Sequence, residues 1–217
     1  SKPKGTIKSP INNGHESVEV ELLSGFNKIN KTTTNNLGSY SFDKTSIINK
    51  VAPSKNDEWR RGVDIVDVAR IRRHFLETLP LDSKYKILAA DVNKDGKINV
   101  LDVAFTNRLF LQKIQEFPNN TSWRFIPSSL GTNFDPLNVN ITEFISLNDN
   151  NVDDQRLDFI SVKVGDVDHN ALLRDDASGS TRSLLTMDIS IPDTIVNPGM
   201  NIRIPVFADG VDSFSLF

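Results

Sequence analysis

Apolar and polar residues alternate along the first part of the chain. The alternating apolar positions are Val18, Val20, Leu22, Tyr40 and Phe42. A period of two predicts half-buried β-strands, since successive side chains of a strand point to opposite faces. Segments rich in Asn and Gly separate these runs and favour tight turns, because both residues adopt positive φ at low cost. We therefore expect a small antiparallel β-sandwich over residues 1–50.

Between residues 66 and 114 the apolar period becomes helical. The apolar positions here are Val68, Ile71, Phe75, Leu76 and Leu79, then Val103, Phe110, Leu111 and Ile114. This spacing predicts two amphipathic helices, each with one apolar stripe facing a core. Pro80 and Pro118 follow the two stripes, and proline lacks the backbone N–H that a helix interior needs. Both helices are expected to have ended before these prolines.

The two helical segments also repeat each other. Residues 62–69, with the sequence GVDIVDVA, align with residues 97–104, KINVLDVA, at an offset of 35 residues. The simplest explanation is an internal duplication of a unit made of one loop and one helix. The two copies of this unit together are assigned to residues 51–117.

The remaining chain has three parts. Residues 118–170 contain short apolar clusters among Asn, Asp, Ser and Pro, and predict extended segments that pack on the preceding modules. Residues 171–183 have few groups to bury and are expected to be a linker. Alternation returns in residues 184–217, where strands over 185–191 and 200–206 are predicted. So few strands cannot enclose a core, which favours the start of a second sandwich in a longer chain.

Composition narrows the function classes. The chain has 217 residues, a formal net charge of −3 and no cysteine, which gives neither a basic surface for nucleic acid nor thiolate metal ligands. No segment approaches the roughly 18 apolar residues that a membrane span needs. Among the 28 acidic residues Asp outnumbers Glu, 21 to 7, and 22 Asn accompany them. Short oxygen-bearing side chains of this kind favour turns and cation sites.

Residues 91–102 carry the sharpest motif of the sequence. Oxygen donors occupy positions 1, 3, 5, 9 and 12 of a twelve-residue loop, and glycine occupies position 6. A calcium ion needs six to eight oxygen ligands, and alternate side chains reach one point only where the loop turns sharply. The expected ligands of this second loop are Asp91, Asn93, Asp95, the Lys97 carbonyl, Asn99 and Asp102.

At the same offset of 35 residues, a first loop begins at Asn56, but its pattern is degenerate. Arg60 stands where a carboxylate belongs, and position 6 has no glycine. The pattern predicts a weaker calcium site, with Asn56 or Asp57 at its start and Asp64 and Asp67 at its end. Asp166 and Asp168, far along the chain, are interpreted as turn residues rather than ligands.

A calcium loop that ends in Asp and is followed by a single helix, in duplicate, resembles the dockerin repeat. About 60 residues, from Asn56 to Glu116, fit this plan. The resemblance implies two calcium sites and a cohesin partner, recognised through helix surfaces and loop positions 10 and 11. Those positions hold Ile65 with Val66 and Val100 with Leu101, all apolar. We expect them to be buried against neighbouring modules of the same chain.

The flanking segments carry looser resemblances. The pattern of residues 5–42 is similar to transthyretin-like or Cna B-type repeats, and residues 197–206 resemble the first strands of cohesin-like sandwiches. The order of modules looks like that of large secreted surface proteins of Bacteroidetes. This resemblance implies an extracellular or cell-surface location, type IX secretion and a role in adhesion.

The expected architecture is therefore multi-module α+β, with the sandwich, the dockerin-like pair, an extended segment and the start of another sandwich. Catalysis has little support, because the three histidines lie in different modules and no phosphate loop is present. The expected function is a non-catalytic connector stabilised by Ca²⁺. The alternative is a true dockerin that anchors its chain to a separate cohesin. A third hypothesis is a polysaccharide-binding module, which requires an exposed aromatic platform formed by Trp59 or Trp123.

Overall fold

The computed structural model describes residues 3–25, 27–42, 50–147 and 157–172, and the backbone of residues 188–190 and 207–209. The chain divides into two compact units, Ser1–Arg174 and Asp175–Phe217. The second unit contains an antiparallel pair formed by β9 (Asp188–Ser190) and β10 (Phe207–Asp209). The strand expected over residues 200–206 lies outside the described residues.

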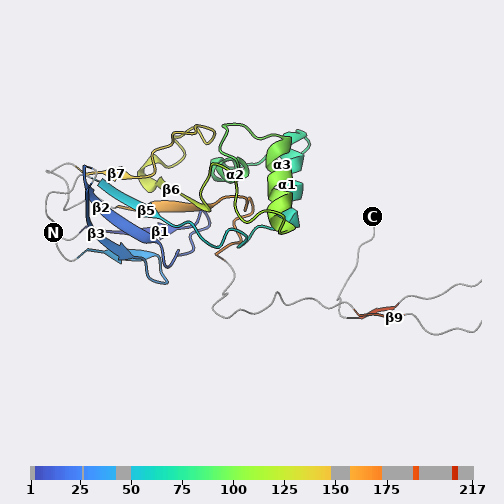
Figure 1. Cartoon of the computed structure of the whole chain (residues 1–217), viewed down its shortest axis with the longest axis horizontal. Helices are drawn as coiled ribbons and strands as arrows, with labels where there is room; N and C mark the ends of the chain where they lie inside the picture. Colours follow the sequence, from blue (N-terminus) through green and yellow to red (C-terminus); the bar gives the residue numbers. More distant parts are fainter. Residues whose placement is uncertain are drawn as a thin grey trace, which may run out of the picture. The chain divides into compact units, whose positions relative to one another are not determined.

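The first unit contains two four-stranded sheets (Figure 1). One has the order β4-β1-β8-β6 and is built from β1 (Lys4–Lys8), β4 (Ser39–Ser41), β6 (Trp123–Pro127) and β8 (Phe159–Lys163). The other has the order β3-β2-β5-β7 and is built from β2 (Glu19–Ser24), β3 (Asn27–Thr33), β5 (Lys50–Ser54) and β7 (Ile145–Ser146). Strands from residues 118–170 thus complete both sheets.

One strand pairing departs from the antiparallel arrangement that the sequence predicts. β8 runs parallel to β1, with Ile7 opposite Phe159, and antiparallel to β6 on its other side. A parallel neighbour requires a long crossover. Here the crossover from β1 to β8 includes all three helices of the described chain.

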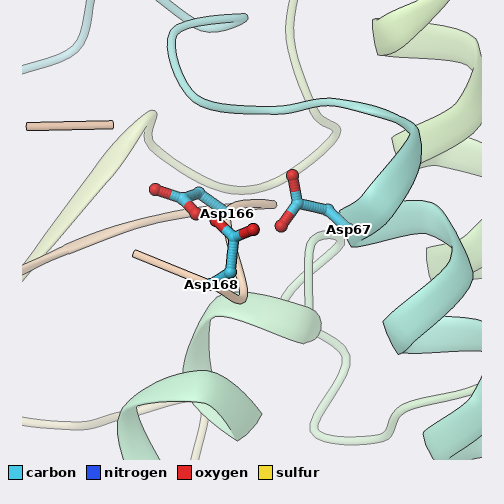
Figure 2. Close-up of side chains that lie close together, drawn as sticks. All are labelled: Asp67, Asp166 and Asp168. Carbon is cyan, nitrogen blue, oxygen red and sulfur yellow. The ribbon is translucent and has the colours of Figure 1, made fainter. Parts of the chain in front are cut away.

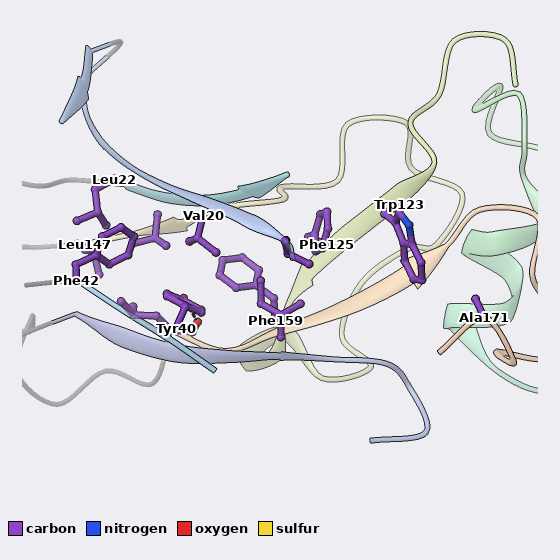
Figure 3. Packing of buried hydrophobic residues seen from close by; sticks show 13 residues of the cluster. Val20, Leu22, Tyr40, Phe42, Trp123, Phe125, Leu147, Phe159 and Ala171 are labelled. Carbon is purple, nitrogen blue, oxygen red and sulfur yellow. Dashed lines mark hydrogen bonds between the residues drawn. The ribbon is translucent and has the colours of Figure 1, made fainter. Parts of the chain in front are cut away.

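The two sheets share one apolar core. Ile7, Tyr40, Phe125 and Phe159 from the first sheet meet Val20, Leu22 and Val51 from the second. Figure 3 shows these side chains between the strand layers, with Trp123 and Ala171 at the end next to the helices. The alternation in the sequence therefore does mark the buried face of β2 and β4.

The helices are α1 (Ile65–Phe75), α2 (Lys84–Ala90) and α3 (Val100–Phe110), and a short 3₁₀ turn follows β6 at Ser128–Leu130. The expected α1 and α3 are confirmed, as is the mixed α+β composition. α2 was not predicted, although Ser83 caps it by accepting a hydrogen bond from Tyr85 N. No helix in the described part of the chain is long and apolar enough to cross a membrane.

A second core joins the helices to the first sheet. Ile71 of α1 and Leu88 of α2 pack with Ile126, Val162 and Val167. Adjacent residues of a strand point to opposite faces, so one face of β6 and β8 packs against the core between the sheets and the other face packs against the second core. This explains why neither strand shows the apolar–polar alternation of a half-buried strand.

Candidate functional site

The second loop starts where α2 ends. Asp91 follows α2, and its two carboxylate oxygens accept hydrogen bonds from Asp95 N and Gly96 N, both at 3.0 Å. Gly96 has φ of +80°, and a side chain there would come within 2.9 Å of the Leu137 carbonyl oxygen. Glycine is thus required by both the turn and its neighbour.

The middle of this loop gathers its oxygen-bearing side chains around Asp95. The amide groups of Asn93 and Asn99 donate to the same carboxylate oxygen of Asp95, at 3.0 and 3.4 Å. Lys97 N donates to the other oxygen at 2.9 Å. The side chains at loop positions 3, 5 and 9 therefore lie close together, as a calcium loop requires.

Asp102 closes the loop from the first turn of α3. Its carboxylate accepts from Val92 N at 3.0 Å and from Asn99 N at 2.8 Å, while the Asn99 side chain accepts from Leu101 N. Burial, together with repulsion from Asp91 and Asp95, raises the pKa of Asp102 to about 6. A buried carboxylate close to two others is stabilised by a bound cation. The donor set fits a hard divalent ion.

The start of the first loop is engaged elsewhere. The side-chain oxygen of Asn56 accepts from Ser122 N at 2.8 Å. Asp57 is exposed and pairs with Lys55 at 3.2 Å, and Glu58 pairs with Arg61. Asn56 and Asp57 thus lie in contacts that do not involve Asp64 or Asp67.

The end of the first loop repeats the second. Asp64 caps α1 and accepts from Val66 N, and Asp67 is buried and accepts from Asp64 N at 2.9 Å. Beside Asp67 lie Asp166 and Asp168, from the turn after β8 (Figure 2). Within the described residues these three form the group of carboxylates whose oxygens all approach within 4.8 Å of one another.

The electrostatics of this group are unusual. Burial is the main cause that raises the pKa of Asp67 to about 7 and that of Asp166 to about 8, and mutual repulsion adds to it. The interpretation of Asp166 and Asp168 as turn residues rather than ligands does not place them beside Asp67. Their spacing, Asp-Val-Asp-His-Asn, is similar to Asp-Val-Asn-Lys-Asp at residues 91–95, and that likeness was the signal available in the sequence.

The expectation that loop positions 10 and 11 are buried was wrong for the described residues. Ile65 and Val66 are 55% and 42% exposed, and Val100 and Leu101 are 60% and 51% exposed. The ends of the two predicted apolar stripes are exposed as well, at Phe75, Leu76, Leu79 and Leu111. The helices use only part of each stripe for the core, and the rest forms an apolar surface.

The tryptophans do not form an exposed platform. Trp123 is buried in the core between the sheets, next to His15, and Trp59 is partly buried against Phe117. The ammonium group of Lys163, also buried, lies 5.9 and 5.4 Å from the centres of the two indole rings. This arrangement belongs to the core rather than to a polysaccharide-binding surface.

Comparison with known proteins agrees with the loop geometry. Residues 61–111 match the dockerin type I domain, a non-catalytic interaction module that typically binds calcium. No curated protein and no solved structure matches the chain. The matched segment runs from the residue before Gly62 to the end of α3, and contains the whole second loop. This part of the chain is thus similar to a dockerin type I domain.

Proposed function

We propose that the dockerin-like unit of this chain is a calcium-dependent docking module for a separate protein of the cohesin class. The observation that carries this proposal is the exposure of the apolar pairs Ile65–Val66 and Val100–Leu101. Large apolar residues that cluster on one helical unit mark interaction surfaces, whereas single ones are common on any protein. Both pairs occupy loop positions 10 and 11, which begin the helices.

Both repeats present this surface in the same way. α1 and α3 each have 11 residues, a capping box, and Asp at the third helical position. Leu76 and Leu111, 35 residues apart, are exposed at the two C-terminal caps. The exposed apolar residues are therefore duplicated with the fold rather than scattered.

Calcium in this proposal prepares the docking surface. The ligands of the second loop are Asp91, Asn93, Asp95, the Lys97 carbonyl, Asn99 and Asp102. Asn99 caps α3, and Asp102 lies in its first turn, so a bound ion fixes the start of the helix that carries Val100 and Leu101. Without the ion, three carboxylates repel one another at this point.

Surface plasmon resonance against a panel of cohesin domains tests this proposal. We expect binding in calcium and its loss in a chelator, and Leu101→Asp should weaken binding at least tenfold. Leu37→Asp is the matched control, since Leu37 is 67% exposed but lies in a turn between strands. Equal binding by both variants, or binding that survives chelation, would contradict the docking surface.

A connector role within one long chain is the second candidate. It is supported by the way the helical unit is joined to the sheets, through the second core and through bonds such as Gly165 N to the Ala89 carbonyl. Failure of every cohesin to bind would leave this role. Both roles imply a location outside the cell or on its surface. We also propose the setting that the resemblance of the module order implies: a secreted protein of Bacteroidetes, with type IX secretion and a role in adhesion.

A further inference from the structure

The turn after β8 has the same conformation as the start of the second calcium loop. Asp166 accepts hydrogen bonds from the backbone N–H groups four and five residues later, at 3.2 and 2.8 Å, as Asp91 does. The fourth residue has positive φ in both segments, 62° at His169 and 55° at Lys94. Residues 166–170 therefore fold like residues 91–95.

This turn also meets Asp67 as the second loop meets Asp102. Val167 N donates to Asp67 at 2.8 Å, and Val92 N donates to Asp102 at 3.0 Å. In each case the donor is the buried valine that follows the first aspartate of the segment. Asp166 and Asp67 are therefore positioned relative to each other in the same way as Asp91 and Asp102.

The two segments touch where a continuous loop would join them. Gly62 has φ of +75°, and a side chain there would come within 2.7 Å of the Ala171 Cα atom. Arg61 Nε donates to the Ala171 carbonyl at 2.9 Å. In the alignment with the second loop, Ala171 corresponds to Gly96 at position 6 and Gly62 to Lys97 at position 7. Because the chain does not continue from position 6 to 7, alanine suffices at position 6.

We propose that the first calcium site is assembled from two segments about 100 residues apart in the sequence. Residues Asp166, Asp168 and Asn170 take positions 1, 3 and 5, and Asp64 and Asp67 take positions 9 and 12. The inference rests on the calcium-binding part of the proposed function, and it gives the degenerate first loop a different set of initial ligands.

Unsatisfied atoms support a ligand at this point. Among the described residues, Asp168 Oδ1 and Asn170 Oδ1 are both buried and have no hydrogen-bond partner. Such atoms are costly unless something satisfies them. The other oxygen of Asp168 lies 3.7 Å from Arg70, on the partly exposed side of the carboxylate. Figure 2 shows the side chains of Asp67, Asp166 and Asp168 close together.

The sequence departs from a normal first loop in a way that this arrangement explains. Arg60 stands at position 5 of the contiguous pattern, and Asn56 and Asp57 are held by Ser122 and Lys55. The contiguous segment therefore does not need to supply the initial ligands, and Asn56 instead accepts a hydrogen bond from Ser122 N, next to β6.

Calcium titration of the full chain by isothermal calorimetry tests the inference. We expect two calcium ions per chain, and at least a tenfold loss of affinity at one site in Asp168→Asn and in Asn170→Ala. Asp57→Asn should keep both sites, and Asp95→Asn should affect the other site only. Circular dichroism verifies that each variant is folded.

Three outcomes overturn the inference. Loss of a site in Asp57→Asn but not in Asp168→Asn would assign the ion to the contiguous loop. A parent chain that binds one ion, lost in Asp95→Asn, would remove the first site and leave the proposed docking function intact. A parent chain that binds no calcium would refute both proposals together.

Discussion

Removing calcium is expected to lower the unfolding temperature of the helices and of the β-core together. At a free calcium concentration 100 times the dissociation constant, one site stabilises the folded state by about 2.7 kcal/mol. For a domain of 150 to 250 residues, 1 kcal/mol corresponds to about 2–4 °C in the melting midpoint. One site in the unit Ser1–Arg174 is therefore worth about 5–11 °C.

The structure explains why the effect should spread beyond the loops. Asn120 of the segment leading to β6 donates to the Asp91 and Val92 carbonyls, each at 3.2 Å. Ile126 and Phe125, neighbours on β6, pack into the helical core and the sheet core respectively. Loosening the second loop thus disturbs a strand that both cores share.

Two signals measured during the same thermal scan check this coupling. Circular dichroism at 222 nm reports the helices. Tryptophan emission is measured in a Trp59→Phe background, where it reports the sheet core, since Trp123 is buried there and is then the sole tryptophan of the sequence. Both should shift equally between calcium and chelator. Asp95→Asn should reduce the shift, and Glu16→Gln, a change at an exposed acid, should not. A shift in the helix signal alone, with unchanged tryptophan emission, would refute the coupling.

Two further predictions concern the cores. Ile71→Ala should lower the free energy of unfolding by about 2–5 kcal/mol, because Ile71 is fully buried, whereas Val66→Ala on the same helix should change it little; urea titration measures both. Burial lowers the pKa of Lys163 to about 7, so between pH 7 and the normal value near 10.5 the unfolded chain binds more protons at this residue, and the contribution of Lys163 to stability should rise with pH. Lys163→Met should remove this rise in urea titrations at pH 6.5 and 9.5, whereas Lys113→Met, at an exposed position, should retain it; a rise that persists in Lys163→Met would contradict the assignment.

Local patterns in the sequence were enough for several elements. Alternation at Val18, Val20 and Leu22 marked β2 and its buried face, and the helical period with capping residues marked α1 and α3. These features depend on residues close together in the chain, so their periods and caps are readable without tertiary structure. The short α2 and the edge strand β3 were missed, because neither has a long enough apolar pattern.

The sequence by itself determined the donor spacing of the second loop and the duplication of the loop and helix unit, since a contiguous loop keeps its ligands within twelve residues. Only the tertiary structure decided that β8 lies parallel to β1, which brings Asp166 and Asp168 to Asp67 across about 100 residues. It also decided which apolar helix residues are exposed, because the stripe is wider than the face that the sheet covers. Contacts between distant segments depend on which strands pair, and no local pattern in the sequence encodes that choice.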